Sequence, residues 1–91
     1  MLKIEAFSPR EREMLVTLSG RVERKHLPEL EHLIGQSAGE DARITFDFRK
    51  VGLVDREAVD FFVNGPGTRA TLRGCPLYLR TWLRLAGRPT D

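Results

Sequence analysis

The chain has 91 residues, with 41% hydrophobic and 31% charged side chains and a formal net charge of +2. This length and composition predict one globular domain over residues 1–91 rather than a disordered segment. No apolar run approaches the roughly 18 residues of a membrane helix, and the charged N-terminus lacks the apolar core of a signal peptide. We therefore expect a cytoplasmic protein with no membrane span.

Two strands are predicted near the N-terminus. Residues 2–6 and residues 14–18 both alternate apolar and polar side chains, and this period of two is typical of half-buried strands. The polar segment between them contains Pro9 and predicts a turn. The two strands should therefore pair as an antiparallel hairpin, and Gly20 is expected to end the second strand.

A helix is predicted over residues 27–34, because four apolar residues recur there at spacings of three and four. Pro28 fits the first turn, where its missing N–H has no intrahelical partner to lose. We expect the helix to end at Gly35 or Gly39, since glycine is common just beyond a helix C-terminus.

The central part of the chain predicts a strand followed by a helix. The apolar residues of 44–48 fall on one face of a strand, and residues 58–63 repeat at helical spacing. Asp55 stands before the helix and reads as its N-cap, where a carboxylate accepts a backbone N–H of the first turn. A short loop should join the two elements, with a sharp exposed turn at residues 54–57.

The C-terminal third predicts a short strand and a last helix. Residues 64–67 contain two glycines and a proline and break the chain, and residues 69–73 fit a strand. Residues 77–85 fit either period, and the flanking Pro76 and Gly87 favour a helix. The element order is then β-β-α-β-α-β-α, an α/β fold with a mixed sheet and helices packed mainly on one face.

Two segments carry a resemblance to a known family. The string from Asp47 to Ala58 resembles the central motif of STAS domains, the anti-sigma-factor antagonist family, in which a strand leads to an Asp that opens a helix. Leu18-Ser19-Gly20-Arg21-Val22 is similar to that family's L-x-G-x-hydrophobic segment. The resemblance covers most of the chain in element order. It implies a STAS-like domain with a role in bacterial signalling.

One position departs from the family pattern. Phosphorylatable STAS domains carry Ser or Thr directly after the motif Asp, whereas this chain has Arg56, followed by Glu57 and Ala58. Arg has no hydroxyl, so phosphorylation does not carry over to this position. The resemblance still implies that Val54, Asp55, Arg56 and Glu57 bind a protein partner, such as an anti-sigma factor kinase or a related regulator. The alternative is that Arg56 and Glu57 are solvated residues of a first helical turn.

Basic residues gather toward the C-terminus. Helical spacing would align Arg80, Arg84 and Arg88 on one face, and such a face can meet an acidic partner or a phosphate. A solvated helix face is the alternative. No aromatic residue interleaves with the three arginines, so nucleic acid is not expected as a partner.

The sequence offers little catalytic or metal-binding chemistry. His26 and His32 would lie on opposite sides of a helix, and the lone Cys75 is expected to be inert. Asp47 and Asp55 flank one predicted loop, where they could bind a cation or act as acid and base, but capping and backbone bonding explain them more simply. We expect no catalytic residue, no metal and no cofactor.

Two functions fit these observations. The first is a non-enzymatic regulatory protein-interaction module of STAS type, without phosphorylation switching at its motif turn. The alternative is an accessory subunit of STAS type that binds a small ligand, either a nucleotide or a lipid. The sequence also leaves a homodimer open, and a basic nucleic-acid binder is a more distant reading.

Overall fold

A computed structural model describes residues 1–36 and 42–87. Within these residues one four-stranded sheet has the order β1-β2-β3-β4. The first pair is antiparallel, whereas β2 with β3 and β3 with β4 are parallel. The strands are β1 (Leu2–Phe7), β2 (Glu13–Val22), β3 (Arg43–Val54) and β4 (Thr71–Arg73). The expected hairpin and the mixed sheet are confirmed.

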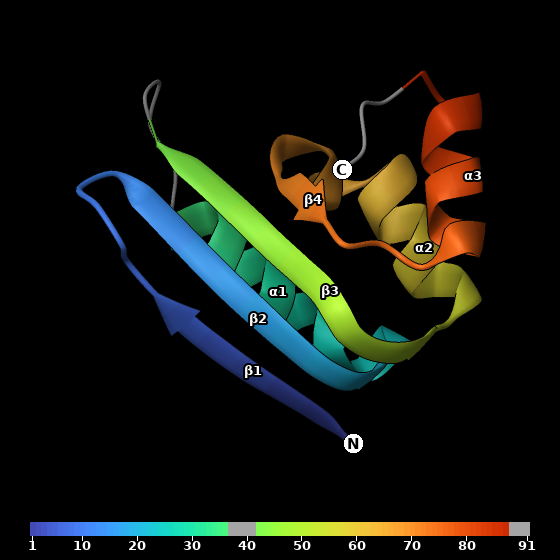
Figure 1. Ribbon diagram of the computed structural model, residues 1–91, viewed down its shortest axis with the longest axis horizontal. Coiled ribbons are helices and arrows are strands. Elements are labelled where there is room, and N and C mark those ends of the chain that lie inside the picture. Colours follow the sequence, from blue (N-terminus) through green and yellow to red (C-terminus); the bar gives the residue numbers. More distant parts are fainter. Residues whose placement is uncertain (37–41, 88–91) are drawn as a thin grey trace.

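Helices follow the second, third and fourth strands (Figure 1). They are α1 (Leu27–Gln36), α2 (Arg56–Val63) and α3 (Leu77–Leu85), with short 3-10 helices η1 (Arg24–His26) and η2 (Pro66–Arg69). The element order β-β-α-β-α-β-α is confirmed, and so is the helix at the C-terminal end. None of the helices that the structure describes is long and apolar enough to cross a bilayer.

The core lies between one face of the sheet and the helices. Alternate residues of β2 and β3 are buried, and they form one cluster with the buried residues of the helices. Figure 1 shows α1 behind β2 and β3, and α2 and α3 on the side of β3 where β4 lies. The Phe62 ring of α2 meets Phe46 and Phe48 of β3 edge to face, at centroid distances of 5.5 and 5.1 Å. These ring contacts pack α2 against the sheet.

The opposite face of the sheet is polar. Asp47 points to this face and is nevertheless buried. Its carboxylate tolerates burial because it accepts hydrogen bonds from the backbone N–H of Arg49 (3.0 Å) and from the Arg49 guanidinium (2.7 Å). The side-chain hydrogen bonds from Arg49 hold the pKa of the Asp47 carboxyl below its ordinary value. The stability that this pair contributes is therefore present above the ordinary pKa of Asp and is lost as the pH falls through the lowered pKa.

Two predicted boundaries are wrong, the predicted end of α1 is tested only at Gly35, and β4 starts at Thr71 because Arg69 lies in η2. Gly20 does not end β2, which continues to Val22 through two register irregularities against β3. Gly20 instead has a φ of 107°, and a side chain there would collide with the carbonyl of Met1. Glycine is needed at this point because the chain start approaches the strand closely, not because the strand stops.

The next boundaries are the ends of α1 and β3. α1 runs through Gly35 to Gln36, since Gly35 lacks the positive φ with which a glycine ends a helix. Gly39 lies outside the described residues. β3 extends to Val54, so no loop separates it from α2 except Asp55. The added length of β3 pairs with the end of β2, where Val22 lies opposite Val54.

Candidate functional site

The parallel pairing of β2 and β3 brings two chain segments together at one edge of the sheet. Both strands end at this edge, so the chain leaving β2 toward η1 lies beside the chain entering α2. The N–H of Asp55 donates to the carbonyl of Val22 (3.0 Å), which fixes the two exits to each other. The candidate site is the first turn of α2 at this edge.

Asp55 anchors the turn with both carboxylate oxygens. Its Oδ1 accepts the N–H of Ala58 (2.9 Å), which confirms the predicted N-cap. Its Oδ2 accepts the N–H of Arg24 at the start of η1 (2.8 Å). The second bond joins residues 31 positions apart, and sequence reasoning missed it because nothing local signals it. One side chain thus fixes α2 and η1 in a single arrangement.

The exposed part of the turn is shorter than predicted. Arg56 and Glu57 are exposed and adjacent, as expected, but Val54 is buried with 4% of its surface accessible. Its N–H donates to the hydroxyl of Tyr78 on α3 (2.7 Å). Val54 is therefore a core residue that connects the turn to α3, because β3 extends farther than its sequence suggested. The turn presents Arg56 and Glu57 on the rigid base that Asp55 provides.

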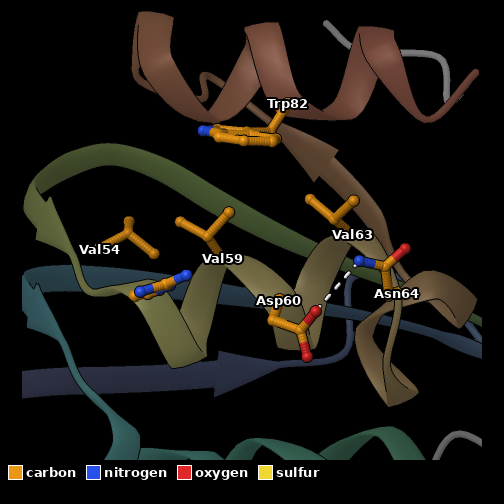
Figure 2. A pocket seen from close by; sticks show the side chains of 7 residues that line it. Val54, Val59, Asp60, Val63, Asn64 and Trp82 are labelled. Atoms are coloured by element: carbon orange, nitrogen blue, oxygen red, sulfur yellow. Dashed lines mark hydrogen bonds between the residues drawn. The ribbon is translucent and has the colours of Figure 1, made fainter.

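Two grooves meet at Arg56. The α2–α3 groove has a volume of about 530 Å³ and is lined by Val54, Arg56, Val59, Asp60, Val63, Asn64 and Trp82. Figure 2 shows the Trp82 ring, carried by α3, facing Val59 and Val63 of α2 across this groove. The second groove, of about 500 Å³, lies between α2 and the start of α1 and includes Glu57. Sequence reasoning did not find either groove, because each depends on how α2 packs against a distant element.

The described residues include only two of the three arginines of the predicted basic face. Arg84 is exposed, whereas Arg80 is half-buried and its Nε has no hydrogen-bond partner in the described part of the chain. Arg88 lies outside the described residues. Arg80 lies next to the buried Leu79 and one turn from the buried Leu83, which explains its partial burial.

The residues considered for metal binding or catalysis have structural contacts. His26 Nδ1 accepts the N–H of Glu23 (3.1 Å) at the start of η1, and the His32 ring is hydrogen-bonded to Gln36 (3.2 Å). Cys75 is buried. Residues 1–36 and 42–87 contain no group of three His, Cys, Asp or Glu placed to hold a metal ion.

Replacing Asp55 tests how the turn is anchored. Asp55→Ala should lower the free energy of unfolding by about 1 to 2 kcal/mol, because the cap of α2 is lost. Asp55→Asn should cost about half as much, since its one oxygen can still accept the N–H of Ala58 while its amide cannot accept that of Arg24. Urea denaturation followed by circular dichroism measures both losses. Equal losses that depend on added divalent cations would instead indicate a cation site.

Comparison with known proteins shows the fold of the chain. No protein-family model matches the sequence, and no curated protein is significantly similar to it. The structure has the STAS-like fold of the anti-sigma factor antagonists: a small mixed sheet with three helices in the order described. The expected fold is thus confirmed.

Two solved structures illustrate the likeness. The anti-sigma factor antagonist SpoIIAA in its unphosphorylated form matches with a TM-score of 0.68 and 12% sequence identity, over 91% of this chain and 83% of that one. A DUF3478-family protein with a SpoIIAA-like fold from Shewanella loihica matches with a TM-score of 0.51 and 12% identity, over 99% of this chain and 82% of that one. At this identity the likeness shows the fold.

Proposed function

We propose that this protein is a non-enzymatic regulatory module, a single domain over residues 1–91, that binds a protein partner in the cytoplasm through the first turn of α2. The observation that carries the proposal is the pair Arg56 and Glu57, exposed on a turn that Asp55 fixes with both oxygens. The turn lies in the fold of an anti-sigma factor antagonist. We propose an anti-sigma factor kinase or a related regulator as the partner.

The chemistry of the turn supports binding by charge. Neither Arg56 nor Glu57 forms an ion pair within the described residues, so both charges are available to a partner. The hydrogen bonds of Asp55 hold the backbone in place before binding, which reduces the entropy lost on association. Arginine is also enriched among the residues that dominate binding energy at interfaces.

We also propose that this turn is not switched by phosphorylation. Arg56 directly follows the capping Asp55 and has no hydroxyl to accept a phosphoryl group. A phosphate would add nearly two negative charges at a helix N-terminus, whereas Arg56 holds a permanent positive charge there. Partner binding is therefore constitutive. Incubation with a partner kinase and ATP, followed by mass spectrometry, tests this: stoichiometric phosphate on Thr45 or Thr68 that changes partner affinity would overturn it.

Charge reversal tests the contact surface. Arg56→Glu should weaken binding to a partner identified from the gene neighbourhood by roughly tenfold or more, since an interface charge of the wrong sign costs over 1.4 kcal/mol. Isothermal titration calorimetry measures the affinity. The matched control is Arg10→Glu, an exposed arginine in the hairpin turn between β1 and β2. Equal affinities for Arg56→Glu and the unmodified protein would show that the turn is not the contact surface.

The second candidate function is a small-ligand accessory subunit, and the α2–α3 groove favours it. Its volume lies in the range of pockets that hold small molecules. Titrating a nucleotide or a short-chain phospholipid while recording amide NMR spectra tests this function directly. Shifts confined to the residues lining the groove would support it.

A further inference from the structure

We propose that the exposed apolar face of α3, together with the α2–α3 groove, binds an acidic amphipathic helix of a protein partner. This inference rests on the proposed function and extends its contact surface from the turn at Arg56 to α3. The argument uses the apolar side chains of α3, the shape of the groove, and the charges around both.

α3 leaves most of its large apolar side chains in solvent. The exposed fractions are 72% for Leu77, 40% for Tyr78, 56% for Trp82 and 76% for Leu85. At 3.6 residues per turn these four positions fall within an arc of about 140°. Contiguous apolar surface of this kind marks an interaction site more often than scattered exposed residues do.

The core does not account for this face. Leu79 and Leu83 are fully buried and hold α3 against the rest of the molecule. The exposed arc lies on another side of the helix, and within it only the Tyr78 side chain is hydrogen-bonded to the rest of the described chain, through its hydroxyl, which accepts the N–H of Val54. A partner that covers this arc would remove its apolar surface from water, which favours binding.

The groove beside this face suits a helix. Val59 and Val63 lie one turn apart on α2, and the Trp82 ring faces them from α3 (Figure 2). An amphipathic helix places apolar anchors at the same spacing, at positions i, i+3 or i+4, and i+7. Tryptophan is also one of the residues that most often dominate binding energy. A partner helix laid in the groove would extend the packing of α2 and α3.

The surrounding charge selects an acidic partner. The sequence of α3 contains Arg80 and Arg84 and no acidic residue. Arg56 also lines the groove. None of these three arginines forms an ion pair within the described residues. The acid of the groove, Asp60, already accepts a hydrogen bond from the Asn64 amide (3.1 Å). This bond leaves Asp60 charged, so Arg56 and Asp60 balance each other in the groove lining, and the excess of positive charge comes from Arg80 and Arg84 of α3.

The same charges argue against a second copy of this chain as the occupant. A two-fold symmetric contact places the same surface on both sides. α3 facing α3 would bring Arg84 of each copy near the other, with no acidic residue on the helix to compensate. A flat membrane also fits poorly, because Val59 and Val63 line a groove that a flat surface does not fill.

Trp82 makes the proposal testable, since it is the single tryptophan of the chain and lies in the groove. The probe is a synthetic helical peptide of about four turns, with leucines on one face and glutamates flanking them. A second peptide replaces every glutamate with lysine. The acidic peptide should shift the Trp82 emission to shorter wavelength and bind at least about tenfold more tightly than the lysine peptide.

Leu85→Ser is the diagnostic variant, because Leu85 is highly exposed and its replacement should leave the fold intact without adding a charge. It should weaken acidic-peptide binding by about tenfold or more, the size of effect expected at a binding anchor. Phe7→Ser is the matched control: it removes an exposed apolar side chain on β1 and should change the affinity by less than about twofold. Thermal melts of both variants verify that they are folded.

Four results would overturn the proposal. They are equal binding of the two peptides, binding of neither, an emission shift produced instead by vesicles of phosphatidylcholine and phosphatidylserine, or self-association in sedimentation equilibrium that Leu85→Ser abolishes. The peptide measurement is independent of the partner titration with Arg56→Glu. If Arg56→Glu weakens partner binding but the acidic peptide does not bind, only the proposed helix site on α3 is rejected. If the acidic peptide binds but Arg56→Glu leaves partner affinity unchanged, only the turn is rejected as a contact surface.

Discussion

Phe62→Ala is expected to lower the free energy of unfolding by about 3 to 5 kcal/mol. Phe62 is fully buried, and its ring meets Phe46, Phe48 and Phe61 at centroid distances of 5.5, 5.1 and 5.0 Å. Truncation removes all three contacts and leaves a cavity between α2 and the sheet. A domain of this size is stable by only about 5 to 15 kcal/mol, so the variant should be close to unfolding at moderate temperature.

Urea denaturation followed by circular dichroism measures this loss, and an unchanged m-value would show that the unfolding transition remains comparable. Phe7→Ala is the control. It removes the same atoms, but from a side chain that is 54% exposed. Phe46→Ala should match Phe62→Ala, since the two rings share one contact. A loss below about 1 kcal/mol for either core variant would mean that the rings do not pack as described.

Gly67→Val should lower the free energy of unfolding by about 3 kcal/mol, the upper end of the usual cost of overpacking. Gly67 is buried in η2, directly against α2. A Cβ there would lie 2.7 Å from Cδ1 of Phe62 and 2.8 Å from the carbonyl oxygen of Phe61. The carbonyl belongs to the helix backbone and cannot rotate away, so η2 or α2 must move.

Gly35→Ala is the control for Gly67→Val. A Cβ at Gly35 meets nothing within 4 Å, and Gly35 lies inside α1. Alanine should therefore stabilise the protein by about 0.5 to 1 kcal/mol through its higher helix propensity. Opposite signs in urea melts of the two variants are the expected result. A Gly67→Val protein as stable as the unmodified chain would show that η2 does not press against α2.

The elements that follow from local pattern were predictable from the sequence. Alternation identified β1 and the start of β2, and Asp55 before an apolar helical repeat gave the start of α2 correctly. The errors arose where pairing between distant strands decides the outcome. β2 continues past Gly20, and β3 reaches Val54, because the ends of these two strands pair with each other. In the sequence the two strands are separated by α1, so no local pattern predicts this pairing.

The candidate site was predictable only as a list of neighbouring residues. Arg56 and Glu57 were placed on the exposed turn by position alone, whereas the burial of Val54 depends on the length of β3. The bond from Val54 to Tyr78 joins residues 24 positions apart. Contacts at this separation arise from tertiary packing, and the α2–α3 groove arises in the same way.

The edges of the sheet have a consequence for aggregation. Unpaired strand edges can recruit further strands and start fibrils, and native proteins blunt them with charge, short strands or coverage. β1, at one edge, carries an ion pair between Lys3 and Glu5 (3.0 Å). At the other edge β4 is three residues long, and the chain after it stays beside β3, where a side chain at Gly74 would collide with that of Arg49. Neither edge offers a long flat template for strand addition, so this protein should resist growth into cross-β assemblies.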